Sequence, residues 1–258
     1  MPENALFSLA GHVAVVIGGG GVLAGEMAAG LARAGAEIAV VDVIPENAQA
    51  RAASIAATGR GAIGIQCDAT SKADLERTLR TVLERFKHVD ILINAAGVNS
   101  GTPFFEISEE EWQRILDIDL TSVFLACQVF GKAMVDAGRG GSIISISSVS
   151  SGPPLSKVFT YSVAKAGVNQ ITQFLARELA PHRIRVNAIM PGFFPAEQNR
   201  KLLTEERVAS IIGHTPMKRF GESSELVGAV VYLASPQASS FVTGSILRVD
   251  GGFTATTI

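Results

Sequence analysis

The chain has 258 residues, of which 47% are apolar and 18% charged, so it can bury a large core and intrinsic disorder is excluded. Its 22 basic and 24 acidic residues give a net charge of −2, which provides no basic field for a nucleic acid or an anionic membrane as a partner. Cys67 and Cys127 form no CxxC pair, so neither a disulfide framework nor a cysteine zinc site is indicated, and a reduced, cytoplasmic location is expected. Because no basic region precedes an early apolar stretch and the uncharged run 13–25 is too short to span a bilayer, we expect neither a secretory signal nor a membrane anchor.

Short apolar runs rich in Val and Ile alternate along the chain with longer segments of helical periodicity. The runs that we expect to be strands are 13–17, 38–41, 62–66, 91–93, 142–146, 185–189 and 245–249. The segments that we expect to be helices are 26–34, 47–57, 72–86, 109–137, 161–179 and 223–233. Runs without polar alternation are typical of parallel strands that are covered on both faces. The pattern therefore predicts a doubly wound α/β fold with a parallel sheet of about seven strands in one domain spanning residues 1–258, and ligands at the carboxyl ends of the strands.

A glycine-rich turn joins the first expected strand to the first expected helix. Four glycines occupy positions 18–21, and the helix is expected to begin near Leu23. The unpaired N–H groups and the dipole of a helix N-terminus favour a pyrophosphate at such a turn. A tight turn that holds no ligand is the alternative interpretation.

An acidic residue, Asp42, ends the second expected strand. A carboxylate at this place can accept hydrogen bonds from both ribose hydroxyls of an adenosine, and it would repel the 2′-phosphate of NADP. Val43 and Ile44 follow, so no Arg or Lys stands beside it to offset that repulsion. The turn and Asp42 together predict NAD as the cofactor, with NADP disfavoured; a surface Asp that caps a turn is the alternative.

Further along, Tyr161 and Lys165 are spaced i and i+4, which places a phenol and an ammonium on one helical face. A neighbouring positive charge stabilises a phenolate and brings the phenol toward the working range of a general acid/base. Ser147 and Ser148 follow the fifth expected strand, where a hydroxyl would face the same crevice. A tyrosine and a lysine at this spacing on a solvated helix are common, so the signal depends on the three elements occurring together.

The stretch 191–216 interrupts the alternation with three prolines, a polar patch at 197–201 and a short helical piece around 202–212. A long insertion after the carboxyl end of a strand is where a substrate lid would lie. Phe193 and Phe194 either line this lid or pack into the core.

Taken together, these motifs and several others resemble the short-chain dehydrogenase/reductase family over the whole chain. The matching stretches are 18–25, 67–70, 94–97, Ser148 with Tyr161 and Lys165, 186–188, 191–192 and 249–252. The resemblance implies a Rossmann-type fold and a hydride exchanged between the nicotinamide and a carbinol or carbonyl carbon.

By the matching positions, the resemblance implies a role for each site residue. Tyr161 would be the acid/base, Ser148 would hold the substrate oxygen, and Lys165 would bind the nicotinamide ribose and favour the phenolate. Asp68 would contact the adenine edge, and Asn94 would hold the loop on the cofactor side. The full set expected to bind the cofactor is Gly18, Gly20, Gly21, Val22, Leu23, Asp42, Asp68, Ala69, Asn94, Ala95, Ala96, Gly97, Tyr161, Lys165, Pro191, Gly192 and Phe194.

A narrower resemblance, in the stretches 155–158, 191–194, 197–200, 214–217 and 219–221, is to the mannonate (fructuronate) oxidoreductase-like branch, which acts on sugar acids. Lys157 near the tyrosine and Arg200 in the expected lid could each hold the carboxylate of such a substrate. The residues expected to contact the substrate are Ser148, Lys157, Phe193, Asn199 and Arg200.

The chain departs from the family pattern at several positions. Ile17 replaces a threonine, and Val22 and Ala24 replace glycines, so their side chains could crowd the pyrophosphate. Ala196 replaces a threonine that touches the carboxamide, and Asp119 replaces the asparagine of the catalytic tetrad. The negative charge of Asp119 should partly cancel the effect of the ammonium on the phenol.

The leading hypothesis is an NAD-dependent dehydrogenase of a sugar acid or polyol, assembled as a homotetramer. The alternatives are a non-catalytic NAD-binding regulatory protein, which has no need to keep Ser148, Tyr161 and Lys165, and an NADPH-dependent 3-ketoacyl-type reductase, which Asp42 disfavours. Because the four histidines have no paired metal spacing, no metal site is expected.

Overall fold

The computed structural model describes residues 6–153, 155–195 and 204–255. In it, seven parallel strands form one sheet in the order β3-β2-β1-β4-β5-β6-β7. The strands are β1 Val13–Ile17, β2 Glu37–Asp42, β3 Ala62–Gln66, β4 Ile91–Asn94, β5 Gly141–Ile146, β6 Ile184–Pro191 and β7 Ile246–Val249. This doubly wound sheet confirms the predicted Rossmann-type α/β fold.

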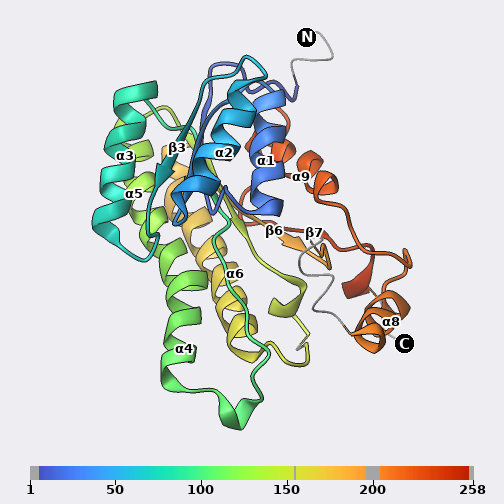
Figure 1. The fold of residues 1–258 in the computed structure, drawn as a ribbon. Coiled ribbons are helices and arrows are strands. Elements are labelled where there is room, and N and C mark those ends of the chain that lie inside the picture. The colour runs from blue at the N-terminus through green and yellow to red at the C-terminus, as the bar shows by residue number, and fades with distance from the viewer. Residues whose placement is uncertain (1–5, 154, 196–203, 256–258) are drawn as a thin grey trace.

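Helices cover both faces of the sheet (Figure 1). They are α1 Val22–Arg33, α2 Pro45–Ala56, α3 Lys72–Phe86, α4 Glu109–Leu116, α5 Ser122–Ala137, α6 Phe159–Leu179, α8 Glu205–His214 and α9 Val227–Ala234. Alternate residues of a strand point to opposite faces, so Val16 of β1 packs with Met27 of α1 while Val15 packs with the helices of the other face. The two apolar layers that result lie under α1, α2 and α9 on one side and under α3, α5 and α6 on the other.

The predicted boundaries differ from the structure mainly at the ends of helices. The first helix begins at Val22, close to the start near Leu23 that the glycine turn predicts and four residues before the periodic segment 26–34, because the N-cap is Gly21. The last predicted helix opens with a 3-10 turn, Ser223–Leu226, before α9 begins.

The predicted helix over residues 109–137 is continuous but contains a wide turn. A π-helical segment, Asp117–Thr121, separates α4 from α5 and carries the fully buried Asp119. By length and composition this run could cross a membrane, but half of its most apolar window is buried within the fold. Single π turns are frequent at functional sites, because the extra residue re-aims side chains.

The sheet order positions the site. The strand order reverses between β1 and β4, and ligands of doubly wound sheets bind outside the carboxyl ends of the strands at that point. The segments that leave these ends are the glycine turn after β1, the loop after β4 and the serines after β5.

Candidate active site

The glycine turn is held between two strand ends. The N–H of Gly19 donates to the Val41 carbonyl at 3.0 Å, and that of Gly20 donates to Oδ2 of Asp42 at 3.0 Å. Gly18 has φ +75°, and a Cβ there would lie 2.8 Å from the backbone nitrogen of Ala96. No side chain fits at Gly18, because the loop after β4 passes directly against it.

The first turn of α1 is left open to an anion. The N–H of Gly21 donates back to the Gly18 carbonyl at 3.1 Å, so the glycine amides are engaged within the protein. The N-cap, Gly21, provides no side-chain hydrogen bond to the helix, which starts at Val22 and Leu23. The helix dipole and the uncapped first-turn amides of α1 therefore fit a pyrophosphate. Val22 is 45% exposed, so its side chain does not fill the turn.

Asp42 is a structural part of this turn as well as a candidate ligand. Besides the bond from Gly20, its Oδ1 accepts from the N–H of Ile44 at 3.0 Å. Each carboxylate oxygen has a second lone pair that can accept a ribose hydroxyl. The sequence did not reveal these two backbone contacts, which fix the orientation of the carboxylate.

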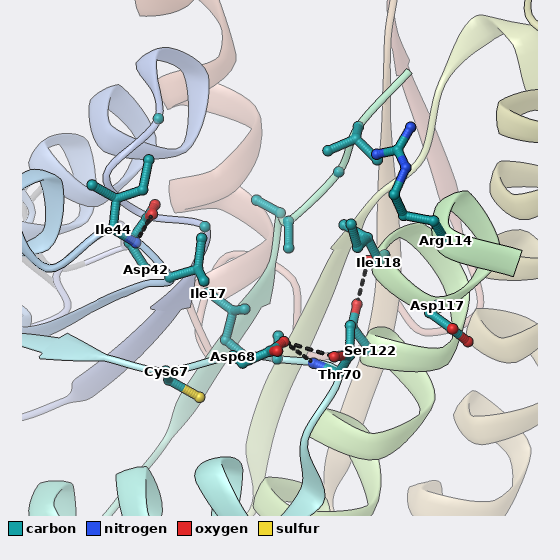
Figure 2. Close-up of a pocket in the computed structure, with 18 of the residues that line it drawn as sticks. Ile17, Asp42, Ile44, Cys67, Asp68, Thr70, Arg114, Asp117, Ile118 and Ser122 are labelled. Atoms are coloured by element: carbon teal, nitrogen blue, oxygen red, sulfur yellow. Dashed lines mark hydrogen bonds between the residues drawn. The ribbon is translucent and has the colours of Figure 1, made fainter. Parts of the chain in front are cut away.

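A cavity of about 1250 Å³ opens beside the turn (Figure 2). Its walls come from the glycine turn, the ends of β2 and β3, the loop after β4 and the face of α4. The predicted cofactor residues that line it are Gly18, Gly21, Asp42, Asp68, Ala69, Ala95, Ala96 and Gly97. The lining also includes Gly97, which lies beside Lys165.

Asp68 is exposed and lines this cavity, and Figure 2 shows its bonds to Thr70. Its Oδ1 accepts from the N–H of Thr70 at 2.9 Å and from the Thr70 hydroxyl at 2.7 Å. These bonds hold the turn after β3 beside the cavity wall.

Asn94 makes different contacts from those expected of a loop-holding residue. Its side-chain amide donates to the Ser145 hydroxyl at 3.3 Å and to Sγ of Cys127 at 3.5 Å. It therefore joins β4 to β5 and α5. The loop after it is held at Ala95, whose N–H donates to the Ile17 carbonyl at 3.0 Å.

A buried ion pair lies where the loop after β4 meets the π turn. Nζ of Lys165 is 3.2 Å from Oδ1 of Asp119, and the two side chains are 4% and 0% exposed. Oδ2 of Asp119 accepts from the N–H of Val98 at 2.9 Å. Burial raises the pKa of the Asp119 carboxyl, although the Lys165 charge and the Val98 bond act against that rise.

Gly97 fits tightly against this pair. A Cβ at Gly97 would lie 2.7 Å from Oδ1 of Asp119 and 3.4 Å from Nζ of Lys165. The absence of a side chain at this position therefore lets the ion pair approach the loop that lines the cavity.

The structure brings Tyr161, Lys165 and the serine segment together at the carboxyl end of β5. Tyr161 is half-buried, and Nζ of Lys165 lies 5.4 Å from the centre of its ring. The Ser147 hydroxyl donates to the Lys165 carbonyl at 3.4 Å, and Nδ2 of Asn169 donates to the Ser151 hydroxyl at 2.9 Å. The serine segment is thus fastened to α6, the helix that carries the tyrosine and the lysine.

Ser148 is oriented by its neighbour. Its hydroxyl oxygen accepts from the N–H of Ser150 at 3.2 Å and from the Ser150 hydroxyl at 3.0 Å. With both lone pairs used in this way, the hydroxyl hydrogen of Ser148 remains the group that can donate to a substrate oxygen.

The predicted residues after β6 have packing roles. The N–H of Gly192 donates to the Val249 carbonyl at 2.9 Å, where Pro191 ends β6. The ring centre of Phe193 lies 5.2 Å from that of Phe253, and Phe194 covers Gly221, where a Cβ would meet its ring at 2.3 Å. Both rings pack against apolar clusters in the structure. Asn199, Arg200 and Ala196 lie outside the described residues.

Lys157 lies exposed at a left-handed position, φ +64°, just before α6. The residue before it, Ser156, accepts from the guanidinium of Arg207 in α8 through its hydroxyl at 2.5 Å and through its carbonyl at 3.2 Å. This contact between α8 and the loop before the tyrosine was not predicted. No sequence pattern marks it, because the two segments are 51 positions apart.

Sequence reasoning also missed several lining residues. Val98, Arg114 and Ile118 line the cavity, and Arg114 and Ile118 come from α4 and the π turn. Val98 directly follows the motif at 94–97, so a signal for it existed. No sequence signal marked the residues of α4, because their position depends on how the long helix packs.

Comparisons with known proteins agree with this geometry. A family model described as enoyl-(acyl carrier protein) reductase matches residues 21–254. The chain is 36% identical to 2-dehydro-3-deoxy-D-gluconate 5-dehydrogenase of Escherichia coli, covering 96% of this chain and 98% of that protein. A 3-oxoacyl-[acyl-carrier-protein] reductase of Synechocystis is 33% identical, covering 95% of this chain and 98% of its own length.

Solved structures match just as fully. Gluconate 5-dehydrogenase from Burkholderia cenocepacia, in complex with NADP and tartrate, has a TM-score of 0.93 at 31% identity and covers 98% of this chain and 99% of its own. A provisionally assigned D-mannonate oxidoreductase from Haemophilus influenza with bound NAD has a TM-score of 0.93 at 33% identity, with the same coverage. The sugar-acid resemblance seen in the sequence is supported by these relatives. The chain belongs to the short-chain dehydrogenase/reductase family and is an NAD(P)-dependent oxidoreductase.

Proposed function

We propose that this protein exchanges a hydride between NAD and a secondary alcohol or ketone of a sugar acid or polyol. The observation that carries the proposal is the cluster of Ser148, Tyr161 and Lys165 at the carboxyl end of β5, fastened together by the Ser147 bond to α6. The relatives named for gluconate derivatives support the substrate class.

Each side chain has a definable task in this mechanism. The Tyr161 phenolate takes the hydroxyl proton of the alcohol, and the phenol returns it in the reverse direction. The Ser148 hydroxyl donates to the substrate oxygen and so orients it. The Lys165 ammonium favours the phenolate, and its ion pair with Asp119 fixes its position.

The nicotinamide cofactor, when bound, supplies the site that accepts or releases the hydride. The first turn of α1 would hold its pyrophosphate, Asp42 its adenosine ribose, and Asp68 with Ala69 the adenine edge. Pro191, Gly192 and Phe194, at the end of β6, would border its nicotinamide half.

We infer a preference for NAD from the charge beside the ribose. Asp42 is held in place by Gly20 and Ile44, and the exposed residues after it, Val43 and Ile44, carry no positive charge. Burying a phosphate dianion against this carboxylate is costly, so kcat/KM should favour NAD+ over NADP+ by at least ~100-fold. A steady-state comparison of the two cofactors tests this inference, and equal efficiencies would contradict it. One relative binds NADP and another NAD, so the measurement on this chain is needed.

A carboxylate on the substrate would be held by Lys157. Its ammonium is exposed, four positions before Tyr161, and the contact of Ser156 with Arg207 fixes the loop beside it. For substrates that carry a carboxylate, the Lys157→Ala variant should raise KM by about tenfold with little change in kcat. Lys132→Ala, on the exposed side of α5, is the matched control. If KM were unchanged for every acidic substrate, Lys157 would not bind the substrate carboxylate.

A panel assay separates the proposal from its competitors. NAD+ is offered with sugar acids and polyols, and NADPH with a 3-oxoacyl thioester, while the absorbance of the reduced nicotinamide is followed. Turnover with a sugar acid or polyol supports the proposal, and turnover of the thioester alone would favour the 3-ketoacyl-type reductase. A protein that binds NAD but turns over no substrate would be the non-catalytic module.

We further propose that the enzyme is a cytoplasmic homotetramer and that part of 191–216 closes over the substrate. Exposed apolar side chains on α5 and α6, among them Phe124 and Phe174, support self-association. The lid is supported by the bond from Arg207 of α8 to Ser156, because this bond brings α8 to the loop before Tyr161.

A further inference from the structure

A second cavity, of about 580 Å³, lies at the end of the sheet away from the candidate active site. Its floor is formed where β5 and β6 begin, at Gly141 and Ile184. The carboxyl ends of these same strands lead to Ser148 and Pro191. No residue of the dehydrogenase machinery lines this cavity, so its contents are independent of the proposed function.

Most of the charged residues that line this cavity are arginines. Arg139, Arg183 and Arg185 contribute three guanidinium groups, and Asp90 is the one carboxylate among the described residues that line the cavity. Asp90 is already engaged: it accepts from the N–H of Val13 at 2.9 Å, and it lies 3.1 Å from Nε2 of His88 and 3.3 Å from Nε of Arg139. The cavity is therefore positively charged in a protein whose net charge is −2.

Arg185 is the least compensated of the three. Its side chain is buried. Its guanidinium donates to the hydroxyl of Ser239 at 2.7 Å and to three carbonyls, those of Leu233 at 2.8 Å, Ala234 at 3.3 Å and Ser235 at 3.5 Å. These partners are neutral, and within the described part of the chain no carboxylate lies within 4.0 Å of it. Burial lowers the pKa of Arg185. A buried guanidinium without a counter-ion is unfavourable, and an anion in the cavity would relieve that cost.

Arg183 is held in position by the loop that precedes β5. It has φ +59°, and its guanidinium donates to the Gly138 carbonyl at 2.6 Å. A Cβ at Gly140, which has φ +80°, would lie 2.7 Å from the Arg183 carbonyl oxygen. This close approach fixes the backbone that carries Arg183 beside the cavity.

We propose that this cavity binds a small metabolite through a phosphate monoester group. Three guanidinium charges opposed by one engaged carboxylate match the charge of a phosphate dianion. The exposed side chains of Arg139 and Arg183 can donate to its acceptor oxygens, and the buried Arg185 adds its charge. The volume exceeds that of a phosphate alone and admits a body of the size of a sugar. The fully exposed ring of Phe241, which lines the cavity, offers an apolar surface to that body.

Calorimetric titration at constant ionic strength tests the proposal, with inorganic phosphate, ribose 5-phosphate and ribose as the probes. Saturating NAD+ is present throughout, so that the cofactor cleft is filled. We expect saturable binding of phosphate and of ribose 5-phosphate, with the latter tighter, and none of ribose. Absence of saturable heat with both phosphate probes would overturn the proposal.

Charge-neutralising variants then locate the site. Arg139→Gln with Arg183→Gln should weaken ribose 5-phosphate binding at least about tenfold for each lost charged donor. Arg177→Gln, an exposed residue of α6 outside the cavity, is the control and should leave binding unchanged. Thermal unfolding of each variant checks that it is folded. The assignment to this cavity would be contradicted if the double variant and the control weakened ribose 5-phosphate binding equally, or if the double variant left it unchanged.

Discussion

Asp119 places a carboxyl group beside the lysine that neighbours the candidate acid/base. Its carboxylate lies in the π turn, fully buried, with Lys165 at 3.2 Å and the Val98 amide at 2.9 Å. Relatives with an asparagine here would place a neutral group beside the ammonium. In this chain we expect the negative charge of Asp119 to oppose part of the effect of Lys165 on Tyr161.

Replacing this charge should therefore change the pH dependence of catalysis. In the Asp119→Asn variant the ammonium acts on Tyr161 without opposition, so the phenolate forms at lower pH. The midpoint of the pH profile of kcat/KM for alcohol oxidation should fall by about half a unit to one and a half units. The affinity for NAD+, measured by fluorescence titration, should change little. Superimposable pH profiles would show that Asp119 does not act on the tyrosine.

Eight of the residues that line the cavity were predicted from the sequence, but the contacts within the site were not. The spacing of Tyr161 and Lys165 within one helix is local, so the sequence indicates that they share a face. The bonds of Asp42 to Gly20 and of Arg207 to Ser156 join segments that meet only in the folded chain. Asn94 was expected to hold the loop after it, and its bonds to Ser145 and Cys127 depend on the packing of β5 and α5.

At the scale of elements, α1, the helix that follows the glycine turn, packs closely against α9. Gly30 lies at their contact, where a Cβ would approach Cγ1 of Val227 to 2.5 Å. The two helices cover one end of the same apolar layer, with Leu226 and Val230 buried in it. The close approach is possible because Gly30 has no side chain.

A pair of alanine substitutions tests this packing. Gly30→Ala should lower the free energy of unfolding by about 1–3 kcal/mol, because the methyl group has no room. Gly228→Ala, in α9 with no atom within 4 Å of the added carbon, should raise it by about 0.5–1 kcal/mol through helix propensity. Urea unfolding of both variants measures the difference. A Gly30→Ala protein as stable as the Gly228→Ala protein would mean that the helices can separate without cost.

Strands were easier to predict than helix ends. The strands β1 and β3 have the expected bounds. In β1 the reason is that a strand buried on both faces leaves a continuous apolar run. The π turn at 117–121 has no such signature, since the residues on either side continue the same helical periodicity. Periodicity alone placed the start of the first helix too late, at residue 26, because no capping side chain marks the helix start, whereas the glycine turn placed it near Leu23, one residue from the observed Val22.

At the scale of the whole molecule, the exposed faces of α5 and α6 bear on assembly. Phe124, Val163 and Phe174 are 46%, 39% and 62% exposed on these neighbouring helices. Apolar surface of this kind usually indicates an interface. Light scattering at micromolar concentration should give the mass of four chains. Phe124→Glu with Phe174→Glu should give a smaller species, while Phe241→Ser, at the other cavity, should not. A monomeric wild-type protein would refute the tetramer.

The central claim is that this cleft performs hydride exchange with Tyr161 as the acid/base. The most direct measurement compares kcat/KM of the wild-type and Tyr161→Phe proteins with NAD+ and the best sugar acid or polyol. General acid/base catalysis contributes roughly 10²–10⁴-fold, so the variant should lose at least about 100-fold in the rate of reduced nicotinamide formation. Its affinity for NAD+ should be retained, which separates lost chemistry from lost binding. Equal rates in the two proteins, or no turnover by a wild-type protein that binds NAD+, would contradict the account.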